Sequence, residues 1–328
     1  MIKFIKRILF SLSVLLLIDT LIIGNYIDYL PNKEVDKRLQ YVLEGKINKD
    51  VIIVGSSRGA RNIIASDLEK NTGKTCYNLS FPGSDVTFHE FIIKTLLKFN
   101  DPPDYIVLTI DGLHQLTPSS SIKFRFDRLY PLINYDYIVE ELIKKREISS
   151  SARYVNTLRL KRSQYDFRQR VFGELDSLLD CGSMPINFQD KRLDTIYYSS
   201  KETLYSEYIG EESKQKIDAL LSINEILMEQ GVGLVIVFPP NLHPDPIGLE
   251  ERIVNMLNLN GVITVPENDS IYKNPIYYYD GGHLQKNGAH HYTNYLAKEL
   301  NLIYQMSNKP ANISADRFYL KQSESQSY

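Results

Sequence analysis

The chain has 328 residues, of which 43% are hydrophobic and 24% are charged, with a formal net charge of −2. This composition supports a folded core and excludes wholesale disorder, and the near-neutral balance argues against a surface built for nucleic acid. Two cysteines, Cys76 and Cys181, exclude a disulfide framework and cannot by themselves form a structural zinc site.

An apolar stretch over about residues 8–24 contains a single charge, Asp19. Extended towards Leu30, it reaches the roughly 20 residues of a membrane-spanning helix, although Asp19 within it would cost about 3 kcal/mol. We expect a signal anchor over residues 1–30, with a cytoplasmic N-terminus and the remaining chain outside. A cleaved signal peptide and a soluble amphipathic helix are the alternatives. The basic residues that set this orientation are Lys3, Lys6 and Arg7.

After the apolar stretch, a linker helix over residues 31–50 is expected to lead into an α/β domain over residues 51–304, followed by a disordered tail at 305–328. Runs of Val, Ile and Leu predict strands at 51–54, 75–79, 105–110, 233–238 and 262–265. Helical spacing predicts helices at 58–70, 86–99, 211–230 and 289–300. This alternation predicts a three-layer sandwich around a parallel sheet of about five strands.

Residues 118–208 interrupt the alternation and are expected to form a mainly helical insertion over one edge of the sheet, with helices near 137–145 and 165–179. The middle of the insertion is basic. Its charges form either ordinary solvated helix faces or a cap that binds an anionic or sugar substrate. The basic residues are Arg146, Arg153, Arg159, Lys161, Arg162, Arg168 and Arg170.

The first candidate site follows the first strand, where Gly55-Ser56-Ser57-Arg58-Gly59 leads into a helix. In open α/β sheets, sites gather outside the carboxyl ends of strands, and a serine there lies beside helix N–H groups that favour negative charge. Ser57 is therefore a candidate nucleophile. The alternatives are that Ser56 or Ser57 only caps the helix, or that the turn binds phosphate.

The second candidate is Asp280-Gly281-Gly282-His283, just before the last helix. The two glycines allow the loop to fold back so that the carboxylate meets the imidazole and fixes its tautomer, as a triad acid does. The alternative is a surface turn with a capping Asp. A metal site has little support, because His290 and His291 fall in the helix behind and are expected to face its surface or core. We expect neither a metal nor a cofactor.

The third candidate is Gly83, in the loop after the second strand, which offers an unobstructed backbone N–H of the kind an oxyanion hole needs. Taken by itself, this segment reads as an ordinary loop. Its interest comes from its combination with the other two motifs, because all three lie just after predicted strands or before the last helix.

Together, the three motifs resemble the SGNH/GDSL hydrolase superfamily, whose sheet is flavodoxin-like. The resemblance covers about residues 50–112 and 230–302. It implies that Ser57 is the nucleophile, His283 the general base and Asp280 its orienting carboxylate. The backbone N–H groups of Ser57 and Gly83 would then bind the oxyanion.

One block departs from the family pattern. The family carries Gly-x-Asn-Asp after the third strand, whereas this chain reads Thr109-Ile110-Asp111-Gly112-Leu113-His114 and has no Asn there. His114 or a side chain from the insertion is expected to replace the missing donor, or else catalysis is weak or absent. The auxiliary candidates around the site are Arg58, Asn78, Asp111 and His114.

The Gly-Ser-Ser start and the N-terminal anchor resemble the membrane-anchored branch that includes proteins of teichoic-acid D-alanylation and exopolysaccharide O-acetylation. This resemblance implies an esterase or O-acyltransferase at the cell membrane that acts outside the cytoplasm. Its partners would be a cell-surface glycan or acylated polymer and a membrane-bound acyl donor protein, with no nucleic acid. The rival expectation is a non-catalytic envelope protein that binds or assembles glycan and has a degenerate site.

Overall fold

The computed structural model describes residues 1–160, 171–173, 177–187, 203–259, 262–265 and 269–307. The chain divides into two compact units. One combines residues 1–40 with 125–172, and the other combines residues 41–124 with 173–328. The segment expected to be a single insertion, 118–208, is therefore shared between the two units.

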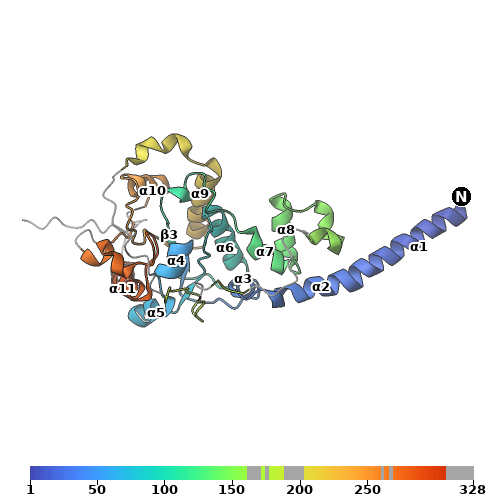
Figure 1. Cartoon of the computed structure of the whole chain (residues 1–328), viewed down its shortest axis with the longest axis horizontal. Coiled ribbons are helices and arrows are strands. Elements are labelled where there is room, and N and C mark those ends of the chain that lie inside the picture. Colours follow the sequence, from blue (N-terminus) through green and yellow to red (C-terminus); the bar gives the residue numbers. More distant parts are fainter. Residues whose placement is uncertain (161–170, 174–176, 188–202, 260–261, 266–268, 308–328) are drawn as a thin grey trace, which may run out of the picture. The chain divides into compact units, whose positions relative to one another are not determined.

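The first unit begins with an almost continuous helical stretch, drawn in blue in Figure 1. It consists of α1 (Ile2–Ile18), a π-helical turn (Asp19–Ile23), α2 (Gly24–Tyr29) and a 3₁₀ turn (Leu30–Lys33). The stretch Ile2–Lys33 is long and apolar enough to cross a membrane. No residue of α1 is buried, as expected for a helix whose apolar side chains face lipid.

Among the described residues, the rest of the first unit is mainly helical. The helix expected at 137–145 is confirmed as α8 (Asp136–Lys144), which buries Ile138, Val139 and Leu142. The helix expected at 165–179 falls largely outside the described residues, and the described parts, 171–173 and 177–179, have no regular structure. The other elements are α7 (Phe126–Leu129) and 3₁₀ turns at Tyr130–Leu132, Ser150–Arg153 and Asn156–Arg159.

The second unit contains a parallel sheet of four strands in the order β2-β1-β3-β4. Three of these strands begin where the sequence predicts, and β2 begins one residue later. The fifth strand expected at 262–265 is reduced, among the described residues, to one parallel bridge between Val237 and Ile263. The strands are β1 (Val51–Val54), β2 (Cys76–Asn78), β3 (Tyr105–Thr109) and β4 (Gly233–Val237).

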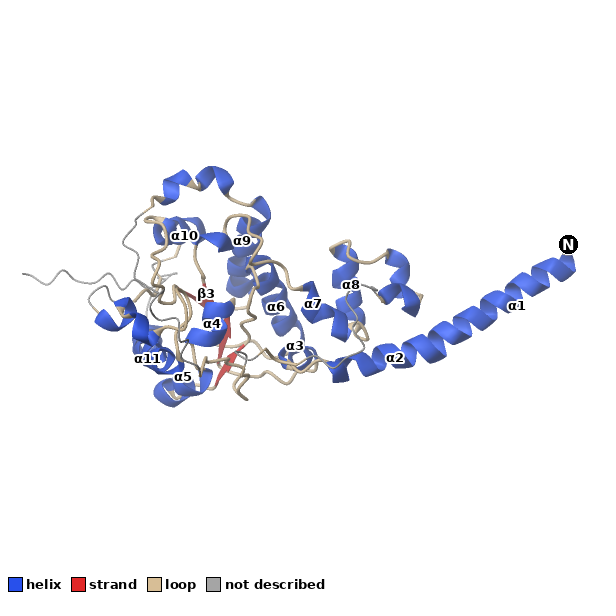
Figure 2. Cartoon of the chain, in the orientation of Figure 1, coloured by secondary structure: helices blue, strands red, loops and turns tan. Residues whose placement is uncertain are grey.

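Helices cover the sheet, and Figure 2 shows the red strands with α5 and α11 on one side and α6 on the other. α5 packs on α11, and α6 packs on α9. The helix expected over 58–70 is in fact two, α4 and α5, because Ile63 and Ile64 are extended and buried between them. The helices are α3 (Arg38–Leu43), α4 (Ser57–Asn62), α5 (Ala65–Thr72), α6 (Val86–Phe99), α9 (Lys214–Glu229), α10 (Leu249–Leu257) and α11 (Lys286–Ser307).

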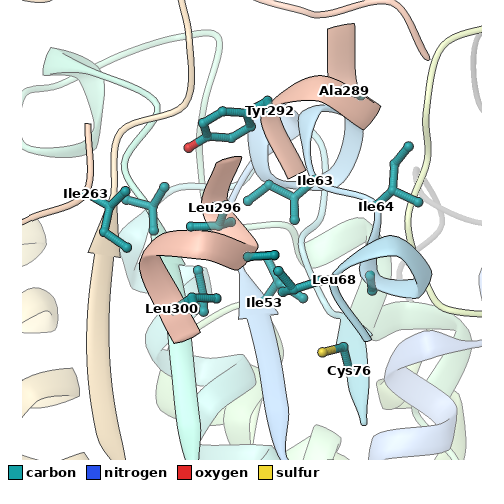
Figure 3. Packing of buried hydrophobic residues seen from close by; sticks show 14 of the residues in the cluster. Ile53, Ile63, Ile64, Leu68, Cys76, Ile263, Ala289, Tyr292, Leu296 and Leu300 are labelled. Atoms are coloured by element: carbon teal, nitrogen blue, oxygen red, sulfur yellow. The ribbon is translucent and has the colours of Figure 1, made fainter. Parts of the chain in front are cut away.

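A large apolar core lies between the sheet and the pair α5 and α11 (Figure 3). Successive strand side chains point to opposite faces, so Val51 and Ile53 of β1 enter this core. Leu296 and Leu300 of α11 and Leu68 of α5 cover them. Because this core fixes α4, α5 and α11 around β1, it also fixes the loops at the carboxyl edge of the sheet.

Candidate active site

Ser57 begins α4 directly after the turn that leaves β1. It is the only residue of Val51–Ala60 that is not buried, so a buried strand–turn–helix presents one hydroxyl to the outside. Ser56 is the N-cap residue of α4, but its side chain makes no capping hydrogen bond. The hydroxyl of Ser57 is bound elsewhere, as described below, so neither serine side chain caps the helix.

Both glycines of the Gly-Ser-Ser-Arg-Gly motif are required by close packing. A Cβ added at Gly55 would lie 1.8 Å from Thr109 Oγ1, and one at Gly59 would lie 2.6 Å from the same atom. The added Cβ at Gly59 would also lie 2.7 Å from Ser80 Oγ. The absence of side chains at 55 and 59 therefore lets the turn and α4 pack directly against the ends of β3 and β2.

The loop that carries Asp280 and His283 is closed by its own backbone. Tyr278 and Leu284 pair as an antiparallel bridge, and Tyr279 N–H donates to His283 O at 2.8 Å. Inside the loop, Asp280 Oδ1 accepts from the backbone N–H groups of Gly282 and His283, both at 2.9 Å. The loop thus folds back as its sequence predicts.

Ser57, His283 and Asp280 are joined by hydrogen bonds. His283 Nε2 lies 2.7 Å from Ser57 Oγ, and His283 Nδ1 lies 2.8 Å from Asp280 Oδ2. Burial opposes ionisation of Asp280, but the bonds from the His283 ring and the two backbone N–H groups outweigh it and hold the Asp280 pKa below its usual value. The carboxylate is therefore charged at neutral pH and faces Nδ1, which leaves Nε2 free to accept a proton from serine.

Two buried asparagines, Asn62 and Asn78, hold α4 in place. Asn62 links the helix to the histidine loop, because its Oδ1 accepts from Leu284 N–H at 2.9 Å and its Nδ2 donates to Gly282 O at 3.3 Å. Asn78 Nδ2 donates to Gly59 O at 2.9 Å, and its Oδ1 accepts from Ser80 N–H at 2.9 Å. Asn78, an auxiliary candidate, thus bonds to the backbone. Asn62 was missed, because a helical Asn carries no motif.

Gly83 lies in the turn after β2 with a φ of +74°, which favours glycine. The turn is fastened beside the β1 end, since Phe81 N–H donates to Gly55 O at 2.9 Å and Ser84 Oγ lies 3.1 Å from the same oxygen. Gly83 is therefore in the loop next to the one that carries Ser57. Its role as an oxyanion donor stays a prediction.

Asp111, from the block that lacks Asn, contacts the residue next to the candidate nucleophile. Its Oδ2 accepts from Arg58 N–H at 2.9 Å, and its Oδ1 lies 3.3 Å from Thr109 Oγ1. The carboxylate thus binds the backbone of the residue that follows Ser57. Sequence reasoning named Asp111 as an auxiliary residue without assigning it this contact.

The Arg58 side chain is buried among the loops that follow β3 and β4. Its Nη1 donates to Pro239 O at 3.3 Å and lies 3.8 Å from Asp245 Oδ2. A Cβ at Gly112 would lie 2.9 Å from Arg58 Nη2 and 2.2 Å from Asp245 Oδ1, so Gly112 must be glycine. Burial raises the pKa of Asp245 although the arginine opposes this. Asp245 was missed because nothing marks the loop after β4.

Of the other histidines, His243 lies against the triad loop, because a Cβ added at Gly281 would lie 2.7 Å from His243 Nε2. The histidines of the auxiliary and metal candidates lie apart from the triad. His114 is exposed, and among the described residues no hydrogen bond links its side chain to Ser57 or His283. His291 Nε2 lies 3.0 Å from Asp269 Oδ2, and His290 pairs with Asp67. Within the described part of the chain, no three His, Cys, Asp or Glu side chains come together as metal ligands.

The basic residues expected in the insertion are partly neutralised. Arg153 pairs with Glu140 at 2.6 Å, and Arg159 pairs with Asp136 at 3.1 Å. The basic residues between 161 and 170 lie outside the described residues. A cap that binds an anionic substrate thus stays a prediction.

A scan against protein-family models finds no match to this chain. A search of curated proteins likewise finds no significant match. The function is therefore inferred from the geometry of the site and from the motifs that the sequence carries.

Proposed function

We propose that this protein is a serine-dependent acyl ester hydrolase or O-acyltransferase that acts on a cell-envelope polysaccharide or a related polymer. One observation carries the proposal: Ser57 Oγ lies 2.7 Å from His283 Nε2, whose other ring nitrogen faces Asp280. The distance is within hydrogen-bond reach of a general base, and Ser57 is the one residue of Val51–Ala60 that is not buried. The motif order and the α/β sheet support an SGNH-like site.

In the proposed mechanism, His283 takes the proton of Ser57 while Oγ attacks the ester carbonyl carbon. The negative charge on the carbonyl oxygen is stabilised by the backbone N–H groups of Ser57 and Gly83. The ester C–O bond then breaks, and the leaving alcohol takes the proton from His283. Water or a sugar hydroxyl, deprotonated by His283, then attacks the acyl-serine carbonyl. The bond from the acyl carbon to Ser57 Oγ breaks, Oγ takes the proton back from His283, and the acid or the new ester leaves. Asp280 stabilises the imidazolium in both steps.

The substrate class is proposed from the N-terminal helix. The apolar stretch Ile2–Lys33 is suited to a membrane, and the basic residues near its start favour a cytoplasmic N-terminus. A site carried outside the membrane meets envelope polymers, and an embedded acyl donor protein could then supply the acyl group. The same arguments support a single-pass, extracytoplasmic enzyme.

The test is hydrolysis of a short-chain nitrophenyl ester by the wild type and by Ser57→Ala and His283→Ala. Loss in both variants supports the mechanism, and full activity in both ends it. If the wild type does not hydrolyse the ester, the same three proteins are assayed for transfer of a labelled acetyl group to a glycan. Transfer that the variants lack also supports the proposal.

A second function, a non-catalytic protein that binds or assembles envelope glycan, is favoured by one observation. The carboxylate of Asp111, bound to Arg58 N–H, is in the block where the resembled family has Asn. A carboxylate there cannot donate to an oxyanion while it is ionised. Glycan binding that is equal in wild type and Ser57→Ala, without turnover in any assay, would favour this second function.

A further inference from the structure

Asp19, the single charge of the apolar helix, is tied to the turn Asn156–Arg159. Its carboxylate accepts from the backbone N–H groups of Asn156 and Thr157, both at 2.7 Å, and from Thr157 Oγ1 at 2.6 Å. Asn156 Nδ2 also donates to Asp19 O at 3.3 Å. Asp19 is buried, whereas every residue of α1 before it is exposed. The helix and the turn are therefore joined.

The level of this joint follows from helix geometry. A membrane core about 30 Å thick takes about 20 helical residues at about 1.5 Å each. The long side chains of Lys and Arg can extend from within the hydrocarbon layer to its surface, so the membrane span starts between Lys3 and Arg7. It then ends at about residue 23 to 27, which puts Asp19 about 6 to 12 Å inside the outer boundary. The turn bound to Asp19 reaches the same level.

The two charged side chains of the joint, Asp19 and Arg159, have protein partners, which lowers the cost of placing them in a membrane. The carboxylate of Asp19 binds the backbone N–H groups that the turn exposes. Arg159, at the end of the turn, donates to Asp136 and to the carbonyls of Ala152 and Ile133. The basic side chain is thus held by protein groups.

Two large apolar side chains flank the joint and are exposed. Tyr154 is 84% exposed and Leu158 is 42% exposed. Tyrosine is typical of the membrane–water interface, where its ring meets the acyl region and its hydroxyl meets water. We propose that residues 154–158, the membrane-contact loop, insert from the outer interface into the lipid bilayer as far as the level of Asp19. The proposal depends on the helix spanning a membrane and is independent of catalysis.

The same joint bears on the fate of the helix. Cleavage between the apolar core and Asp19 would separate the joint from the membrane helix. Cleavage after Asp19 would leave two backbone N–H groups of the turn without their acceptor. The helix is therefore part of the first unit, which supports a retained anchor rather than a cleaved signal peptide.

The experiment measures the depth of the loop in full-length protein reconstituted into phosphatidylcholine–phosphatidylglycerol vesicles. Tyr154→Cys, Leu158→Cys and the control Met228→Cys, which is 53% exposed in the other unit, each carry an environment-sensitive dye. Cys181 is replaced by Ser. Cys76 is retained, because its burial raises the thiol pKa to about 12 and prevents labelling. Lipids with a spin label on the acyl chain quench the dye.

The expected result is at least threefold stronger quenching at 154 and 158 than at 228. Equal quenching at the three positions would overturn the proposal. This is also the result expected if a protein partner, and not lipid, covers the loop in cells. A second comparison breaks the joint. With the dye at position 158, adding Asp19→Leu should lower quenching to the level measured at position 228. Adding Asp28→Leu, which replaces an exposed acid of the same helical stretch, should leave quenching at position 158 unchanged. Unchanged quenching in Asp19→Leu would also contradict the proposal.

Discussion

The carboxylate of Asp111 accepts a hydrogen bond from the backbone N–H of Arg58 at 2.9 Å. Arg58 follows Ser57, so this bond fixes the start of α4 and with it the serine. Under the proposed mechanism, the carboxylate also lies one residue away from the Ser57 N–H group that would bind the oxyanion. We therefore expect Asp111 to help position the serine and to oppose stabilisation of the oxyanion.

Replacing Asp111 with Asn is expected to raise kcat for a nitrophenyl ester severalfold. The amide oxygen keeps the bond to Arg58 N–H, the negative charge is removed, and the NH₂ group adds a donor beside the nucleophile. Steady-state kinetics of the purified protein measure the effect. Asp111→Ala, which lacks the acceptor, is the matched control and should lower kcat. An unchanged or lower kcat in Asp111→Asn, with normal folding, would contradict this account of the site.

Gly59→Ala is expected to lower the free energy of unfolding by about 1 to 3 kcal/mol, the usual cost of overpacking. The new Cβ would lie 2.6 Å from Thr109 Oγ1 and 2.7 Å from Ser80 Oγ, both at the sheet edge. Urea unfolding in detergent measures the change. Gly210→Ala is the control, because nothing lies within 4 Å of a Cβ there. Equal stability of the two variants would show that α4 does not need this close approach.

The buried His89 should make stability depend on pH. Burial lowers its pKa to about 4, with Asp85 opposing and Lys216 adding to the shift. Unfolded histidine has a pKa of about 6.5, so between pH 6.5 and 4 the unfolded state binds more protons. The free energy of unfolding should therefore fall as pH falls through this window, by up to about 3 kcal/mol.

Urea unfolding at a series of pH values measures this dependence, and His89→Gln should flatten the part of the curve between pH 6.5 and 4. His291, a half-exposed histidine on α11, supplies the control His291→Gln. Because the histidine is buried beside Ser84, with its Nε2 2.9 Å from Ser84 Oγ, the glutamine variant is compared by slope rather than by absolute stability. If the free energy of unfolding of His89→Gln changes with pH as steeply as that of the wild type, the pH dependence does not come from His89.

The sheet could be predicted from sequence because its strands are apolar runs at regular intervals. Val51–Val54 and Val86–Phe99 have the predicted bounds. Local patterns failed where tertiary contacts decide the backbone. The helical spacing of 58–70 gave no sign that Ile63 and Ile64 would be extended and buried. Likewise, the apolar run at 262–265 contributes only one bridge, at Ile263.

In the candidate site, the sequence could predict residues that belong to short motifs, namely Ser57, Asp280 and His283. The structure joins them by hydrogen bonds, and their catalytic roles stay a prediction. Residues that act through tertiary contacts could not be found this way. Asn62 bonds to a loop 220 positions away, and Asp245 reaches Arg58 from a loop without a motif.

The most direct test of the proposed chemistry is covalent labelling with a fluorophosphonate, which reacts with activated serines. The labelled full-length protein is digested, and mass spectrometry identifies the modified residue. We predict that the probe modifies Ser57 in the wild type and in Ser56→Ala. We also predict that labelling is lost in Ser57→Ala and His283→Ala. Labelling of Ser57→Ala to the wild-type extent, or a wild type that the probe does not modify at Ser57, would contradict an activated serine at this position.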